Sequence, residues 1–138
     1  MKFQYCSDLH LEFQENKEFL RTNPLLPLGN VLILAGDIVP FKVLKHHDDF
    51  FDYISKNFET TYWVPGNHEY YHFDLAKKQG CFNEKIRENV FLVNNTAVQI
   101  NGVKLFFLLS GLILMLRISL QYSRDCPTSM LSAMIVEC

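Results

Sequence analysis

The residues best suited to chemistry lie in three short segments that combine carboxylate, imidazole and amide groups: Asp8-Leu9-His10, Gly36-Asp37 and Gly66-Asn67-His68-Glu69. Aspartate and histidine together offer the oxygen and nitrogen ligands that suit Mn, Fe, Ni or Zn better than Ca. An aspartate can bridge two cations, and two cations roughly 3.5–4 Å apart can clamp a phosphoryl group and hold a hydroxide for in-line attack. The segments therefore predict metal-assisted hydrolysis of a phosphate ester.

Each segment directly follows a predicted strand. The strands span residues 3–6, 31–35 and 61–64, and the continuous apolar run at 31–35 is typical of a strand covered on both faces. Positions 8, 37 and 67 are 29 and 30 residues apart, about one strand–helix–strand unit each. Because the carboxyl ends of parallel strands meet at one edge of a sheet, we expect the three segments to converge there.

Each segment alone also has an ordinary structural interpretation. Asp8 could cap a helix, and a Gly-Asp pair after a strand is more often a turn than a ligand. Gly-Asn-His-Glu is a more specific pattern, with roughly one chance occurrence in several hundred chains of this length. The glycines at 36 and 66 are expected to allow sharp turns that aim the next side chain at the metals. All three segments in order, each after a strand, favour the functional interpretation.

The remaining elements predict an α/β fold. Residues 48–58 have helical spacing, with Phe50, Phe51, Ile54 and Phe58 on one side. Residues 74–88 are predicted to form a helix interrupted near Gly80. Strands are expected at 91–93, 97–100 and 103–107, and Asn101-Gly102 is a strong hairpin signal. Parallel strand–helix–strand units thus come first, and an antiparallel hairpin follows.

Composition limits the class of protein. The 138 residues are 49% hydrophobic, enough for one domain with a buried core, and this excludes intrinsic disorder. A net charge of −2 provides no basic excess, so nucleic-acid binding is not indicated. The four scattered cysteines, the absence of an N-terminal leader and an apolar run (103–116) shorter than the roughly 20 residues of a membrane span predict a cytoplasmic protein without a membrane anchor.

The sequence resembles the calcineurin-like metallophosphoesterases, and in particular a bacterial branch of small phosphohydrolases. The resemblance rests on "SDLHLEF", "ILAGDIV" and "WVPGNHEYY" and covers residues 1 to about 107. It implies a metallophosphoesterase-type α/β/β/α sandwich, here incomplete, that hydrolyses phosphate mono- or diesters with two divalent metal ions (Mn, Fe, Zn or Ni).

The resemblance also implies a role for each matching residue. Asp8 and His10 would bind the first metal, Asp37 would bridge the two metals, and Asn67 would bind the second. His68 would be the catalytic histidine, which stabilises charge on the phosphoryl group and protonates the leaving group. Glu69 would be structural, or would orient His68, and would not itself be a ligand.

Part of the family pattern is missing. The family has a further His and a GHxH pair, whereas none of the five histidines lies beyond position 72. The second metal would keep only Asp37 and Asn67 and would bind weakly, because water must supply its other ligands. His46, His47 and His72 could substitute, although we expect them to be solvent-facing loop residues. The alternative function is therefore a non-catalytic metal-binding or protein-interaction module on the same scaffold.

The two parts of the chain differ in character. We expect residues 1–107 to be the N-terminal part of a phosphoesterase domain and residues 108–138 to be an aberrant tail. Leu108–Ile113 fits a one-nucleotide shift of a Ser-Thr-Leu-Trp-Ser-His type of segment found in this branch, so we hypothesise a frameshifted translation. A sheet that ended at Phe107 would leave an open edge, which predicts oligomers or poor solubility.

Overall fold

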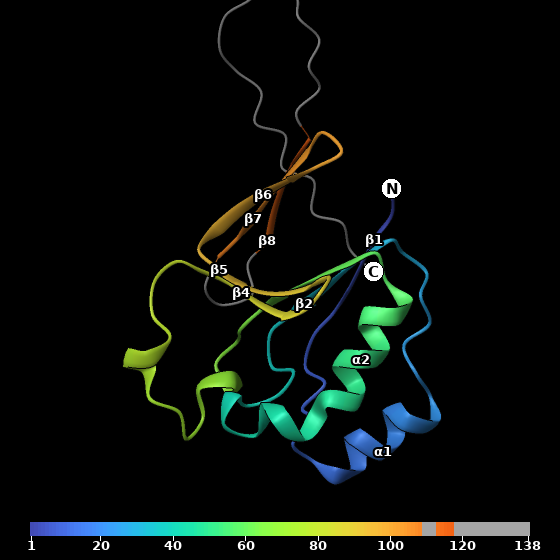
Figure 1. The fold of residues 1–138 in the computed structure, drawn as a ribbon, viewed down its shortest axis with the longest axis vertical. Coiled ribbons are helices and arrows are strands. Elements are labelled where there is room, and N and C mark those ends of the chain that lie inside the picture. The colour runs from blue at the N-terminus through green and yellow to red at the C-terminus, as the bar shows by residue number, and fades with distance from the viewer. Residues whose placement is uncertain (109–112, 118–138) are drawn as a thin grey trace, which may run out of the picture.

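The computed structural model describes residues 1–108 and 113–117, which form two β-sheets and two α-helices (Figure 1). In chain order, with η for 3₁₀ helices, the elements are β1 (Phe3–Cys6), α1 (Gln14–Thr22), β2 (Val31–Ala35), η1 (Phe41–His47), α2 (Asp48–Asn57), β3 (Thr60–Val64), η2 (His68–Tyr70), η3 (Leu75–Lys77), β4 (Phe82–Arg87), β5 (Val90–Asn94), β6 (Thr96–Ile100), β7 (Val103–Phe107) and β8 (Ile113–Arg117). The predicted α/β class is confirmed.

The first sheet has five strands in the order β1-β2-β3-β5-β4. Strands β1, β2, β3 and β5 are parallel, and β4 adds an antiparallel edge. The three strands that precede the chemistry-bearing segments are therefore neighbours that point the same way. Their carboxyl ends lie at one edge of the sheet, as the sequence predicts.

Both faces of this sheet are buried, which explains the continuous apolar run of β2. Leu32 and Leu34 pack with Trp63 and the α2 residues in one core, whereas Val31 and Ile33 pack with the second sheet in another. Successive side chains of a strand point to opposite faces, so one run of apolar residues supplies two cores. Figure 1 shows the resulting layers, with α1 and α2 on one side of the sheet and β6–β8 on the other.

The predicted helix at 48–58 is confirmed as α2 (Asp48–Asn57). Its apolar side chains Phe51 and Ile54 are fully buried and Phe58, directly after it, is 4% exposed. Asp48 and Asp49 occupy its first turn and Lys56 its last, an order that complements the helix dipole. The sequence between β1 and β2 is compatible with a loop or a helix, and the structure has the helix α1 there.

The predicted helix at 74–88 is wrong. Only a short 3₁₀ turn, η3, forms there, and Gly80 adopts a φ of +74° before the chain enters strand β4. Phe82 and Ile86 are compatible with either structure, because residues four apart share a face in a helix and in a strand alike. Pairing with β5 decided the outcome. Residues 82–87 form an antiparallel ladder with β5, and a tight turn joins the two strands.

The second sheet has the order β6-β7-β8, and its first two strands form the predicted hairpin. Asn101 and Gly102 have φ values of +46° and +77°, so both central positions are left-handed as a type I′ turn requires. Within the described residues, the edge of β7 that was expected to be open is paired, because β8 lies antiparallel to it over five residue pairs, and β6 and β8 are the edge strands of this sheet.

The described residues build three of the four expected layers, helix, sheet and sheet, and no second helical layer occurs within them. Most of the predicted aberrant tail lies outside these residues. No helix in the described part of the chain is long and apolar enough to cross a bilayer.

Candidate metal centre

The loops that follow β1 and β2 are joined by main-chain hydrogen bonds beyond the end of the sheet. The N–H of Asp8 donates to the Gly36 carbonyl at 3.1 Å, and the N–H of His10 donates to the Asp37 carbonyl at 3.0 Å. A third bond, from Leu11 to Ile38, measures 2.9 Å. The two loops therefore continue the strand pairing and hold their polar side chains in register.

Three of the predicted ligands occupy strained backbone positions. Asp8, His10 and Asp37 have φ values of +57°, +46° and +56°, in the left-handed region that non-glycine residues rarely adopt. Such residues persist only when the surrounding structure holds them, and they cluster at functional sites. The inter-loop hydrogen bonds provide that support.

The side chains of Asp8, His10 and Asp37 form a group with metal-binding geometry. One ligand atom from each lies within 4.8 Å of the other two. Two carboxylates and an imidazole are a chemically suitable donor set for a divalent transition metal. These three residues, distant in sequence, fit the cation that the family resemblance implies.

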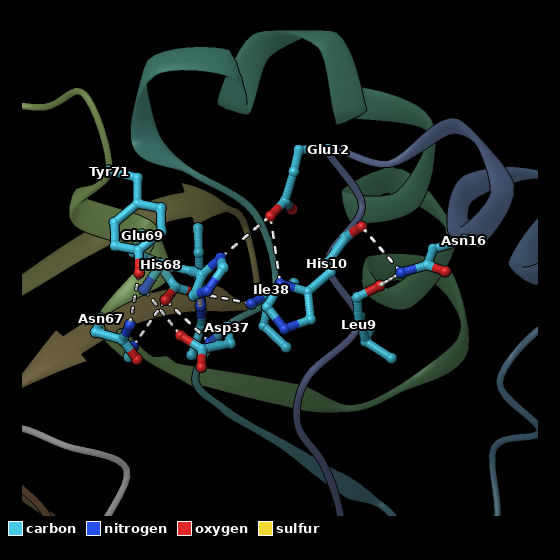
Figure 2. Close-up of polar contacts among 12 residues, drawn as sticks. Leu9, His10, Glu12, Asn16, Asp37, Ile38, Asn67, His68, Glu69 and Tyr71 are labelled. Carbon is cyan, nitrogen blue, oxygen red and sulfur yellow. Dashed lines mark hydrogen bonds and ion pairs between the residues drawn. The ribbon is translucent and has the colours of Figure 1, made fainter.

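The loop after β3 contacts this group through main-chain atoms. The N–H of His68 donates to Asp37 Oδ1 at 2.9 Å, which ties the GNHE loop to the predicted bridging aspartate. Asn67 is exposed, and its amide Nδ2 lies 3.4 Å from the Tyr71 hydroxyl. The structure thus places Asn67 one residue from the contact with Asp37, with its side chain directed toward Tyr71 (Figure 2).

Glu69 is completely buried behind the loops and accepts four hydrogen bonds. Its Oε2 accepts from the N–H groups of Asp37 (2.9 Å) and Gly66 (2.8 Å), and its Oε1 accepts from Ile38 N–H (2.7 Å) and Trp63 Nε1 (3.1 Å). Burial raises the pKa of the Glu69 carboxyl, while the N–H donors of Ile38, Asp37 and Gly66 act in the opposite direction. Its hydrogen bonds therefore orient the main chain of the loops and not the imidazole of His68.

The two glycines serve different purposes. Gly36 has a φ of +91°, the sharp turn that its position predicts. Gly66 is needed for close approach instead, because a Cβ there would lie 2.4 Å from Asp37 Oδ1 and 2.9 Å from Asp37 N. The expectation that both glycines act through turn geometry is wrong for Gly66.

The structure adds one residue that sequence reasoning missed. Glu12 Oε1 lies 3.3 Å from His10 Nδ1 and 3.4 Å from His68 Nδ1, so it contacts two predicted site histidines from different loops (Figure 2). The imidazoles of His10 and His68 are themselves packed edge to face, with ring centroids 4.3 Å apart. The sequence offers no signal for Glu12, because its contact with His68 joins residues 56 positions apart.

In the described part of the chain, the other histidines join neither the Asp8, His10 and Asp37 group nor the cluster of His10, Glu12 and His68. His46 and His72 are exposed, as expected for loop residues. His47 is only 5% exposed, so its predicted solvent-facing position is wrong. Burial lowers the pKa of its imidazole, because desolvation disfavours the charged form.

A cavity of about 290 Å³ lies between α1 and α2, on the helical side of the sheet. Its lining includes Leu11, Lys17, Arg21, His47 and Tyr53, but none of the predicted ligands. It is therefore separate from the metal-ligand group.

Comparisons with known proteins identify the family of the chain. The family model described as calcineurin-like phosphoesterase matches residues 1–130. The chain is 32% identical over 117 residues to "Uncharacterized protein L509" of Acanthamoeba polyphaga mimivirus, an alignment that covers 72% of this chain and 40% of the viral protein. The chain thus spans 40% of the length of that relative. No solved structure shows significant similarity to the chain. The family model matches most of the chain, and the loop residues gather at one sheet edge. The chain therefore belongs to the calcineurin-like phosphoesterase family.

Proposed function

We propose that the chain acts as a metal-dependent phosphoesterase that hydrolyses phosphate mono- or diesters. The observation that carries this proposal is the group formed by Asp8, His10 and Asp37, whose ligand atoms lie within 4.8 Å of one another at the carboxyl ends of β1 and β2. Bound divalent cations would activate water and neutralise charge on the phosphoryl group.

The residues would divide the work as follows. Asp8, His10 and Asp37 would hold the first cation, and Asp37 with Asn67 would contribute to a second. His68 stands over the same edge, fixed through its main-chain bond to Asp37 and its ring contacts with His10 and Tyr71. Its imidazole would stabilise the phosphoryl oxygens and deliver a proton to the leaving oxygen.

The test is hydrolysis of p-nitrophenyl phosphate and bis-p-nitrophenyl phosphate by the full 138-residue chain with added Mn²⁺. We expect Mn²⁺-dependent turnover that Asp37→Asn lowers by more than about 100-fold, beyond the loss typical of residues that only orient a ligand. The ratio of the two rates reports whether monoesters or diesters are preferred. An Asp37→Asn variant that keeps the wild-type rate would contradict the assignment.

A non-catalytic metal-binding or protein-interaction module is the second candidate. The absence of any histidine beyond position 72 favours it, because the second cation then has only two of the family's ligands. One tightly bound Mn²⁺ per chain without turnover of either ester, measured by titration calorimetry and elemental analysis, would support this module over the enzyme.

We retain the proposal that residues 108–138 are a frameshifted tail on the N-terminal part of a phosphoesterase domain. Sequencing the gene tests it: the alternative frame should continue into a segment that contains the missing histidine motifs. An alternative frame without those histidines would end the proposal.

A further inference from the structure

Glu12 lies between two imidazoles that belong to different loops. A single oxygen, Oε1, is 3.3 Å from Nδ1 of His10 and 3.4 Å from Nδ1 of His68. Figure 2 shows both rings turned with the Nδ1 edge toward this carboxylate. The same side chain therefore contacts one predicted metal ligand and the predicted catalytic histidine.

The chemistry of the contact determines which ring nitrogens remain available. An ionised carboxylate only accepts hydrogen bonds, so each imidazole must carry its proton on Nδ1 to bond with Glu12. In a neutral imidazole the other nitrogen, Nε2, then has a free lone pair. The contacts thus favour one tautomer in both rings and leave Nε2 as the reactive nitrogen.

Packing around the rings keeps this arrangement in place. His68 packs against Tyr71 with ring centroids 4.3 Å apart, and against His10 at the same centroid distance. On the other side, Asn16 Nδ2 donates to the carbonyls of Leu9 and His10 at 3.1 and 3.3 Å, which anchors the loop to α1. The rings therefore have little freedom to turn the Nε2 edge toward Glu12.

The two oxygens of Glu12 have different surroundings. The side chain is 18% exposed, and Oε2 is buried without a hydrogen-bond partner among the described residues. A buried acceptor without a partner is destabilising, and native structures keep few of them. Among the described residues, the side-chain contacts of Glu12 are therefore those of Oε1 with the two imidazoles.

We propose that Glu12 is a positioning residue that presents Nε2 of both His10 and His68 to the reaction site. The inference rests on the proposed function for the roles of the two nitrogens: His10 Nε2 toward the first cation and His68 Nε2 toward the phosphoester. One carboxylate would then couple metal binding to proton delivery, because it sets the tautomer and the orientation of both rings. Carboxylates that hold the far nitrogen of a metal-binding imidazole in this way are a common device in metal sites.

The decisive experiment is a long-range ¹H–¹⁵N spectrum of the histidine rings in the full 138-residue chain, at a pH where the imidazoles are neutral. Single His10→Gln and His68→Gln variants assign the signals. We expect both rings to be protonated on Nδ1 and unprotonated on Nε2, and Glu12→Gln to shift both toward the Nε2–H tautomer. The matched control is Glu15→Gln, an exposed glutamate in the first turn of α1, which should change neither ring.

The same spectrum overturns the inference without any variant at Glu12. A wild-type ring that carries its proton on Nε2, for either histidine, would contradict it. Addition of Zn²⁺ should perturb Nε2 of His10 and leave its Nδ1 proton in place. A zinc-bound Nδ1 would instead make Glu12, His10 and His68 a ligand group of their own and refute the positioning role.

Binding and rate measurements separate this inference from the proposed function. By titration calorimetry, Glu12→Gln should weaken Mn²⁺ binding by about 10- to 100-fold, the range typical of such supporting residues, and Glu12→Asp should recover part of the loss. In turnover, kcat should fall while KM stays within about twofold, because proton delivery is affected and not substrate binding. If neither ester is hydrolysed but the tautomers and Mn²⁺ affinities change as stated, the function fails and the positioning role holds. Wild-type turnover and unchanged tautomers in Glu12→Gln would overturn the positioning role and leave the function intact.

Discussion

Two glutamates support the same candidate site, and they do so in different ways. Glu69 is completely buried and accepts four N–H hydrogen bonds, three of them from the main chain of the loops after β2 and β3. Glu12 is partly exposed, contacts two imidazole side chains and leaves Oε2 without a partner among the described residues. One glutamate holds the backbone of the site, and the other orients its reactive groups.

The difference shows how a carboxylate's partners determine what its loss would cost. If Glu69 is removed, buried N–H groups lose their acceptor and cannot reach water, so the penalty falls on folding. If Glu12 is removed, the imidazoles lose the acceptor that sets their tautomer, but they can still bond to water, since the side chains of His10 and His68 are 22% and 27% exposed. The penalty then falls on metal binding and turnover.

The largest effect is expected at Glu69. Glu69→Ala should lower the free energy of unfolding by about 3–5 kcal/mol, because two buried and two part-buried N–H donors are left unpaired. Urea denaturation followed by circular dichroism measures this, and fluorescence of the single tryptophan, Trp63, provides a local probe. Glu15→Gln should stay within about 0.5 kcal/mol as the control. A loss below about 1 kcal/mol for Glu69→Ala would remove the basis of the comparison.

Gly66 tests whether the backbone held by Glu69 must approach Asp37 closely. Gly66→Ala would put a methyl group 2.4 Å from Asp37 Oδ1, so we expect a loss of about 2–3 kcal/mol together with weaker Mn²⁺ binding. Gly80→Ala is the matched control, since Gly80 has a φ of +74° but open space around it. That variant should cost about 1 kcal/mol and leave Mn²⁺ affinity unchanged in calorimetry. Equal effects on Mn²⁺ binding in the two variants would argue against the close approach.

Glu12 should show the reverse pattern of Glu69. Glu12→Gln should change the free energy of unfolding by less than about 1 kcal/mol, because its loss leaves no buried main-chain donor unpaired. Urea denaturation beside the Mn²⁺ titration gives both quantities on one preparation. If Glu12→Gln destabilised the chain as strongly as Glu69→Ala, the division between the two glutamates would not hold.

The smallest effect is expected at Asn67, whose side chain is exposed and directed toward Tyr71. Asn67→Ala should leave the affinity for the first Mn²⁺ within about twofold, the equivalent of roughly 0.5 kcal/mol at a surface position. Asp8→Asn, within the ligand group, should weaken the same binding by at least about 10-fold. Similar losses in both variants, measured by calorimetry, would place Asn67 in the first cation's site.

Local patterns predicted the other strands more reliably than residues 74–88, which contain β4. The apolar runs of β2 and β3 match strands buried on both faces, and Asn101-Gly102 forms the expected turn. Residues 82–87 failed because Phe82 and Ile86 have a spacing that suits a helix and a strand equally. Only pairing with β5 distinguishes the two.

The candidate site, too, was predictable from the sequence only in part. The order of Asp8, His10 and Asp37 after successive strands was sufficient to expect them at one sheet edge. The role of Glu69 as a main-chain acceptor was not predictable, because two of its three main-chain partners, Asp37 and Ile38, come from a loop about 30 positions away in sequence. Glu12 was missed for a related reason: a glutamate two residues past a ligand has no distinctive pattern until a second histidine is brought beside it.

By itself, the sequence determined which residues could bind a metal and which strands carry them, because residue chemistry and hydrophobic periodicity are local properties. Tertiary structure alone decided that one carboxylate would face two imidazoles and another would face the loop backbone. The contacts of Glu12 with His68 and of Glu69 with Asp37 and Ile38 join residues 31 to 56 positions apart, and their geometry depends on strand order and on the approach of Gly66 to Asp37. A hydrogen bond acts only within about 3.5 Å, so its existence is settled by packing and not by composition.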